Sequence, residues 1–303
     1  MNIPIVLIIY HCPDLTKNLV NNLRSVKPKN IYVVADGPKT PQDKVVCDYA
    51  RDMIKEIDWP CQIHKIYARV NMGLHKRVVS GLDTVFKKEK WAIILEDDLV
   101  IDPSFFPYCE QLLKKYAKND QIISISGNNF QFGKNEIKKS YYFSRYVHSW
   151  GWATWKRAWD LYDDNLTDWT KLRQNNWLNT TLSSRVLALY WTMIFDMVSA
   201  GQVDSWAYRW TYSALKNTKL TIIPDRNLVS NIGYGTKATH TTRKSRVMGM
   251  ETSKMIFPLK HPRRVQRNIN ADRQTEMVAY LSPIIILSLL IRSIVKWPLC
   301  KKS

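Results

Sequence analysis

Three consecutive acidic residues, Glu96, Asp97 and Asp98, follow the apolar run at 92–95. Carboxylates this close raise one another's pKa, so their charge is costly unless a cation binds there. Mg²⁺ and Mn²⁺ prefer such oxygens, taking one or two from the protein and the rest from phosphate and water. The triplet therefore predicts a Mn²⁺ or Mg²⁺ site that holds a leaving diphosphate. The alternative is helix capping, since Asp98 and Asp102 both precede plausible helix starts.

The elements before the triplet predict an α/β fold. Short β-branched runs alternate with longer amphipathic stretches, as in βαβ units on a parallel sheet. We expect strands at 3–10, 31–35, 62–67 and 91–95, with helices at 13–25, 42–57 and 73–86. Functional groups in open α/β sheets collect at the carboxyl ends of strands. Asp36 and the triplet both follow such ends, so we expect them to share one crevice.

The second half of the chain is rich in aromatic residues, notably at 141–143 and 148–155. The tryptophans at 148–152 have flat faces that suit sugar rings, and the alternative is a packed corner of the core. Helices are expected near 103, at 184–200 and at 207–216, with strands at 122–125 and 220–223. We interpret this half as the acceptor side of one fused domain.

Four segments carry a resemblance when they are taken in order. They are Tyr10-His11-Cys12-Pro13, Val34-Ala35-Asp36-Gly37, Arg69-Val70-Asn71-Met72-Gly73-Leu74, and Ile94-Leu95-Glu96-Asp97-Asp98-Leu99-Val100 with Pro103-Ser104-Phe105-Phe106 after it. Together they resemble the GT-A fold glycosyltransferases, in particular the EDD motif of N-acetylglucosaminyltransferase I and of bacterial family-2-like enzymes. The resemblance spans about residues 3–242. It implies a Rossmann-like mixed sheet flanked by helices.

The resemblance also implies roles for residues of the donor site. Asp98 would bind the metal, with Asp97 and Glu96 directed toward the ribose and the metal's waters. Asp36 would accept a hydrogen bond from the uracil imide of a UDP-sugar, and its alternative role is to form a turn. His11 and Cys12 stand where the family often has Asn-Arg, which removes a phosphate or base contact.

Four further positions belong to the expected donor site by the same resemblance. Tyr10 lies in the turn after the first strand, and Arg69, Asn71 and Gly73 lie in the segment before a helix. For Asn71 and Gly73 the alternative is a helix cap and a helix start.

A direct displacement that inverts the sugar needs a base to deprotonate the acceptor hydroxyl, on a segment separate from the metal ligand. Asp204, within 203–210, resembles the Trp-Asp-Asp-Trp region that carries this base, although the segment has only one Asp. Asp196 and Asp225 remain alternatives, and Asp204 also suits a helix N-cap.

The loop at 233–241 has glycines for hinging and resembles a lid over the donor. We expect Lys237 to contact phosphate and His240 to bind the metal, with a structural role as the alternative for His240.

The chain carries a formal charge of +19, and its last part is the most basic. Between Lys237 and Ser303 there are fourteen Lys or Arg and three acidic residues. The apolar stretch at 277–295 barely reaches the roughly 20 residues of a spanning helix, which favours an interfacial anchor. It is flanked by basic residues that would attract anionic lipid, namely Arg263, Arg264, Arg267, Arg273, Lys296, Lys301 and Lys302. The alternative is a C-terminal helix packed on the domain or in a dimer.

The expected organisation is a glycosyltransferase domain at 1–242, with a nucleotide-sugar half at 1–127 and an acceptor half at 128–242, and a basic tail at 243–303. The five widely spaced cysteines fit a reducing compartment, so we expect a cytoplasmic protein at the inner face of the membrane. The expected partners are a nucleotide-sugar and a glycan or lipid-linked acceptor.

Two rival functions remain. A sugar-phosphate nucleotidyltransferase would need a glycine-rich loop after the first strand, and 10–13 has no glycine. A nucleic-acid-binding protein is suggested by charge alone, without a recognised motif, so no nucleic acid is expected.

Overall fold

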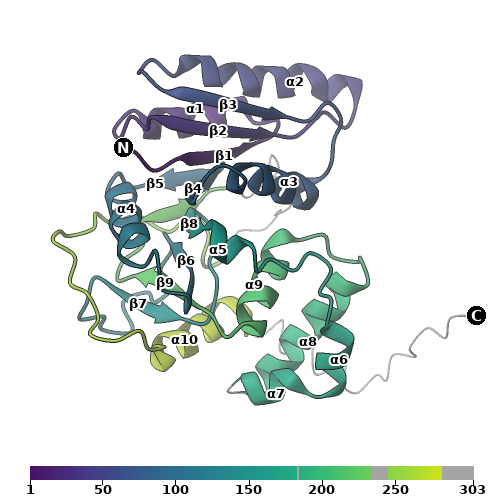
Figure 1. Ribbon diagram of the computed structural model, residues 1–303, viewed down its shortest axis with the longest axis vertical. Helices are drawn as coiled ribbons and strands as arrows, with labels where there is room; N and C mark the ends of the chain where they lie inside the picture. Colours follow the sequence, from purple (N-terminus) through teal and green to yellow (C-terminus); the bar gives the residue numbers. More distant parts are fainter. Residues whose placement is uncertain (183, 234–244, 282–303) are drawn as a thin grey trace, which may run out of the picture.

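The computed structural model describes residues 1–182, 184–233 and 245–281. Its centre is an eight-stranded mixed sheet of order β3-β2-β1-β4-β8-β6-β9-β7, flanked by helices (Figure 1). The strands are β1 (Ile5–Ile9), β2 (Asn30–Ala35), β3 (Gln62–Tyr67), β4 (Trp91–Glu96), β6 (Ile122–Ser126), β7 (Tyr141–Ser144), β8 (Trp152–Trp155) and β9 (Leu220–Pro224). The predicted α/β fold is confirmed, and its sheet is compatible with a Rossmann-like nucleotide-sugar transferase.

The first four strands pair in parallel, and helices connect them. These helices are α1 (Pro13–Leu23), α2 (Pro41–Asp52) and α3 (Leu74–Phe86). The predicted helix at 42–57 ends at Asp52 and continues as the 3₁₀ turn η1 (Met53–Glu56). All five residues of β1 are buried, and Ile8 lies opposite Glu96 in the register of β1 with β4. The carboxyl ends of these two strands therefore lie level with each other.

The second half of the chain completes the same sheet, since β4 pairs antiparallel with β8 and β8 pairs antiparallel with β6. Its helices are α4 (Phe105–Lys115), α5 (Lys156–Trp159), α6 (Trp169–Gln174), α7 (Trp177–Thr181), α8 (Arg185–Ser199) and α9 (Trp206–Lys216). Trp152 is fully buried and stacks on Trp206, with ring centroids 5.5 Å apart. For Trp152 and Trp155 the packed-core interpretation is therefore the one observed.

A short second sheet lies beside the triplet. It pairs β5 (Leu99–Ile101) antiparallel with β10 (Val229–Asn231). Glu96 is the last residue of β4, and Asp97 and Asp98 form the turn between β4 and β5. A later segment of the chain thus covers the turn.

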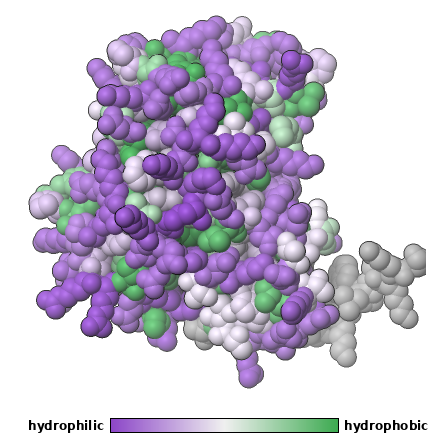
Figure 2. Space-filling model, viewed as in Figure 1, coloured by the Kyte–Doolittle hydropathy of each residue, from purple (hydrophilic) through white to green (hydrophobic). Residues whose placement is uncertain are grey.

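The described part of the predicted tail, residues 245–281, runs across the domain and ends in α10 (Ile269–Thr275) and the π-helical turn η2 (Glu276–Tyr280). Met255 and Ala271 are buried, and the Met255 amide donates to the Ser104 hydroxyl at 2.7 Å. Among these described residues no helix has the length and apolar character to cross a membrane. The face in Figure 2 is mostly hydrophilic, with apolar residues in small separate patches.

Candidate active site

A cavity of about 420 Å³ opens where β1 and β4 end, beside the start of α3 and the segment before α9. It is lined by eight of the residues that the sequence predicts for the site: Tyr10, Asp36, Asn71, Gly73, Glu96, Asp97, Asp98 and Asp204. Arg69 is exposed and is not among the lining residues. Lys237 and His240 lie outside the described residues. One crevice therefore contains both strand-end acids and the candidate base.

The acidic triplet is electrostatically strained as it stands. Burial and the charges of Asp98 and Asp97 raise the pKa of Glu96 well above its ordinary value. Burial and the charge of Asp98 raise the pKa of Asp97 to about 7. Burial also raises the pKa of Asp98, opposed by a hydrogen bond from Asn231. The helix-cap alternative does not hold, because β5 rather than a helix follows Asp98.

Asp98 is enclosed by the segment after β10. The Ile232 amide donates to the Asp98 carbonyl at 2.9 Å, and the Gly233 amide donates to Asn231 Oδ1 at 2.9 Å. A Cβ at Gly233 would lie 2.0 Å from Asp98 Oδ2, so a side chain there would displace the carboxylate. A glycine is therefore required where this segment passes over the acid.

The acidic residues fit a hard cation whose remaining ligands are substrate phosphates and water. Asp98 Oδ1 is buried and has no hydrogen-bond partner among the residues that the structure describes, which leaves one carboxylate oxygen for a ligand. Within the described residues, no group of three His, Cys, Asp or Glu side chains is arranged to hold an ion. Mg²⁺ and Mn²⁺ sites built on one or two carboxylates plus phosphate and water need no such group.

Asp36 is buried and its carboxylate is used within the protein. Oδ1 accepts from the amides of Gly37 at 2.8 Å and Met72 at 2.9 Å. Oδ2 accepts from Asn71 Nδ2 at 3.1 Å and from the Gly73 amide at 3.0 Å. A carboxylate offers about four acceptor positions, and all are occupied here. The direct role observed for Asp36 is thus to fix the loop at 71–73, and a bond to a base would displace one of these donors.

Asn71 and Gly73 serve the same loop. Asn71 also donates to the Gly37 carbonyl at 2.9 Å. Gly73 has φ +80°, a conformation that side-chain-bearing residues rarely adopt, and it is the N-cap position of α3. The capping alternative therefore holds for Gly73, which nevertheless lines the cavity.

His75 and Asp164 are not in the predicted site, yet they hold the candidate base. His75 is 5% exposed, and its Nδ1 lies 2.6 Å from Asp204 Oδ1 while its Nε2 lies 2.5 Å from Asp164 Oδ1. Each ring nitrogen of His75 thus lies within hydrogen-bonding distance of a carboxylate oxygen. His75 therefore holds the Asp204 carboxylate at Oδ1, and that carboxylate remains 61% exposed.

Neither the alternative role of Asp204 as a helix N-cap nor the two alternative bases agree with the structure. Ser205, rather than Asp204, is the N-cap of α9 and accepts from the Tyr208 amide. Asp196 accepts from Trp169 Nε1 at 3.0 Å and pairs with Arg173. Asp225 pairs with the adjacent Arg226. Neither Asp196 nor Asp225 is among the residues lining the cavity.

Arg77 is a third residue that the sequence interpretation missed. It is 6% exposed and lines the cavity, and its Nε has no hydrogen-bond partner within the described ranges of the chain. Burial lowers the pKa of this guanidinium, and the charge of Asp36 opposes the effect. Lys39 also lines the cavity. The wall thus carries cations suited to an anionic ligand.

A signal for two of the missed residues exists in the sequence. His75 and Arg77 lie on the face of α3 that also buries Val78, Leu82 and Val85. Polar residues on an otherwise apolar helix face need a specific partner, because burying them without one is costly. The partners of His75 come from distant segments, so helical periodicity alone does not identify them.

The comparisons with known proteins are partial. No family model matches the chain. The chain is 31% identical over 105 residues to an Arabidopsis thaliana α-1,3-mannosyl-glycoprotein 2-β-N-acetylglucosaminyltransferase. That match covers 32% of this chain and 24% of the relative, so it spans about a quarter of the relative's length.

A cytidylyltransferase from Leptospira borgpetersenii is similar to the structure with a TM-score of 0.34 and 11% identity, over 53% of this chain and 63% of that one. Each of these two proteins is a transferase.

Proposed function

We propose that this protein is a metal-dependent glycosyltransferase, which moves a sugar from a nucleotide-diphosphate sugar to an acceptor hydroxyl. The observation that carries the proposal is the single cavity that joins the strand-end acids to Asp204. The partial likeness to an N-acetylglucosaminyltransferase supports it.

In this proposal the donor diphosphate lies at the strand ends, and Asp98 would hold Mn²⁺ or Mg²⁺ through its unpaired Oδ1. The chemistry supplied by a bound cation is Lewis-acid stabilisation of the leaving diphosphate. Arg77 and Lys39 line the same cavity and offer positive charge to the phosphates. The loop at 71–73, fixed by Asp36, forms the wall against which the nucleoside, proposed to be uridine, packs.

Asp204 is proposed as the base. Its exposed carboxylate accepts the proton of the acceptor hydroxyl while the oxygen bonds to the anomeric carbon and the bond to the diphosphate breaks. His75 and Asp164 hold this carboxylate in place. Trp150 is half-buried and lines the cavity, which gives a sugar ring a flat face to pack on.

The sequence-based expectations for the acceptor and the location of the protein remain part of the proposal. The acceptor class is a glycan or a lipid-linked sugar, and the location is the cytoplasm or the inner face of its membrane.

The test is a donor screen. Purified protein is incubated with UDP-, GDP- and CMP-sugars and Mn²⁺, and the released nucleotide is measured with and without EDTA. We expect Mn²⁺-dependent release from one nucleotide class, preferably UDP-sugars.

Asp98→Asn should abolish that release, whereas the exposed Asp160→Asn should not. Release of pyrophosphate from a nucleoside triphosphate and a sugar phosphate would point instead to a nucleotidyltransferase. A salt-sensitive shift with DNA or RNA, without turnover, would favour the nucleic-acid alternative.

A further inference from the structure

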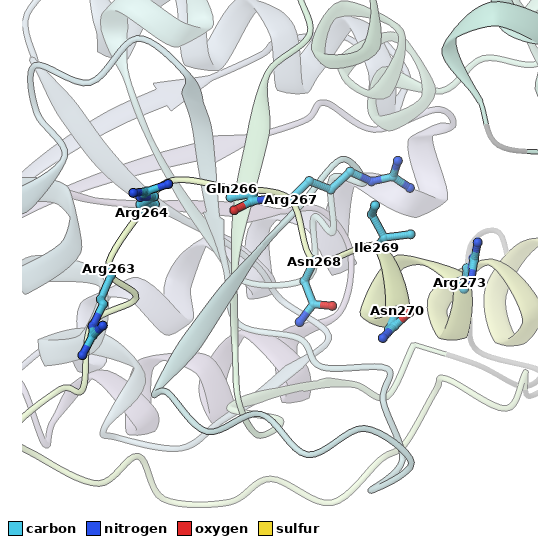
Figure 3. A pocket seen from close by; sticks show the side chains of 8 residues that line it. All are labelled: Arg263, Arg264, Gln266, Arg267, Asn268, Ile269, Asn270 and Arg273. Atoms are coloured by element: carbon cyan, nitrogen blue, oxygen red, sulfur yellow. The ribbon is translucent and has the colours of Figure 1, made fainter.

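A second depression in the surface, of about 860 Å³, is formed by residues that follow those of the candidate site in the sequence. It is formed by the loop before α10 and by α10 itself, and is lined by Arg263, Arg264, Gln266, Arg267, Asn268, Ile269, Asn270 and Arg273. No acidic residue is among these lining residues. Figure 3 shows the four arginines spread along the loop and the helix rather than converging on one point. This arrangement suits an extended anionic surface better than a single small anion.

The acids of this segment face inward. Asp272 is fully buried and accepts from the Ser144 hydroxyl and from Arg267, and Glu276 accepts from the Tyr146 hydroxyl at 2.7 Å. Arg267 is thereby used to neutralise buried carboxylates. The outward surface of the segment keeps only cations.

Arg263, Arg264 and Arg273 are those cations. All three are exposed, and within the described part of the chain no ion pair holds their guanidinium groups. Exposed cations along one surface, with no acid paired to them among the described residues, favour an anionic partner.

Apolar side chains share the outward face of the helix. Ile269 and Met277 are 50% and 57% exposed, and with Arg273 between them they follow a spacing of four residues, which places them on one side of a helix. Ala271, Asp272 and Thr275 point to the interior. A face that combines exposed arginines with large apolar side chains is typical of helices that lie in a membrane interface.

We propose that this arginine face, formed by Arg263, Arg264, Ile269, Arg273 and Met277, docks on an anionic lipid bilayer. The arginines contact lipid phosphates, and Ile269 and Met277 enter the headgroup boundary. A nucleic acid fits less well, because none of the residues lining the depression is aromatic, and aromatic side chains are the usual stacking surface for bases. The docking does not depend on the proposed catalytic function.

The test is co-sedimentation of the full chain with vesicles of phosphatidylcholine alone or mixed with phosphatidylglycerol. Wild type should bind the anionic vesicles and not the neutral ones. The double variant Arg264→Gln/Arg273→Gln should lower partition about 30-fold, since each basic residue near the surface contributes about fivefold. Ile269→Ser/Met277→Ser should also lower it, and added salt should not rescue that loss.

Lys87→Gln/Lys88→Gln removes the same charge from exposed positions after α3 and should bind like wild type. Every variant keeps residues 282–303, so differences report the arginine face. Equal partition of the arginine variant and wild type would overturn the proposal. So would arginine-dependent binding to duplex DNA by a protein that ignores anionic vesicles.

Discussion

The contact of His75 with the candidate base can be dissected atom by atom. In the wild type, Nδ1 faces Asp204 and Nε2 faces Asp164. The amide nitrogen of Asn at position 75 can take the place of Nδ1, and that of Gln can take the place of Nε2. His75→Asn therefore keeps the bond to Asp204 and loses Asp164, whereas His75→Gln does the reverse. The two variants remove one interaction each from the same buried position.

The expected effects on rate and stability differ. Without its partner the Asp204 carboxylate is free to rotate, and misplacement by about 1 Å costs on the order of 100-fold in rate. We expect His75→Gln to lower kcat for transfer about 100-fold and His75→Asn to lower it less than about tenfold. Charge-assisted hydrogen bonds contribute about 1.5–3 kcal/mol, but Asp204 and Asp164 are 61% and 46% exposed. Solvent screening then reduces the stability loss to about 1 kcal/mol for either variant.

The assay compares kcat for transfer, KM for the donor and the urea unfolding free energy, with His64→Gln as a histidine control outside the cavity. KM for the donor should stay within about twofold, because the bond lies on the acceptor side. Equal losses of kcat in the two variants, or losses that follow stability, would refute a positioning role for His75. If the wild-type protein does not turn over any donor, the proposed function is refuted instead.

Three further predictions concern the fold and the donor side. Asp36→Asn should destabilise the protein by about 3 kcal/mol in urea unfolding, because an amide has one acceptor oxygen and its NH₂ group would face the two donors that now bond to the other carboxylate oxygen. Burial lowers the pKa of His148 to about 4. Between that value and about 6.5 the unfolded chain binds a proton that the folded protein does not, so stability should fall by about 3 kcal/mol as pH drops through this window. His148→Phe should remove that part of the slope, and an unchanged slope would contradict it. Gly233→Ala should weaken Mn²⁺-dependent UDP binding in calorimetry without a comparable loss of stability, because its Cβ collides with the Asp98 carboxylate.

The parallel half of the sheet could be predicted because it is made of local patterns. Buried strands appear in the sequence as continuous apolar runs. The acids after β2 and at the end of β4 come together because β1 pairs in parallel with both strands. The strand predicted at 62–67 has these bounds in the structure. The helix predicted at 73–86 begins one residue later, at Leu74, and ends at Phe86 as predicted.

The detailed roles could not be predicted, because they depend on long-range contacts. Asp36 is tied to donors 36 and 37 residues away, and His75 to Asp204 across 129 residues. No local spacing encodes such pairs. Arg69 belongs to the motif with Asn71 and Gly73. Arg69 is nevertheless exposed, whereas Asn71 and Gly73 line the cavity. Membership of a motif thus did not guarantee a place in the site.

The central claim, that Asp98 and a divalent cation hold a nucleoside diphosphate in this cavity, can be measured without knowing the sugar or the acceptor. Isothermal titration calorimetry with UDP should detect binding in the presence of Mn²⁺ and lose it with EDTA. Asp98→Asn should weaken the Mn²⁺-dependent binding by roughly 100-fold at unchanged stability. UDP binding of equal affinity with or without Mn²⁺, in both wild type and Asp98→Asn, would contradict the account.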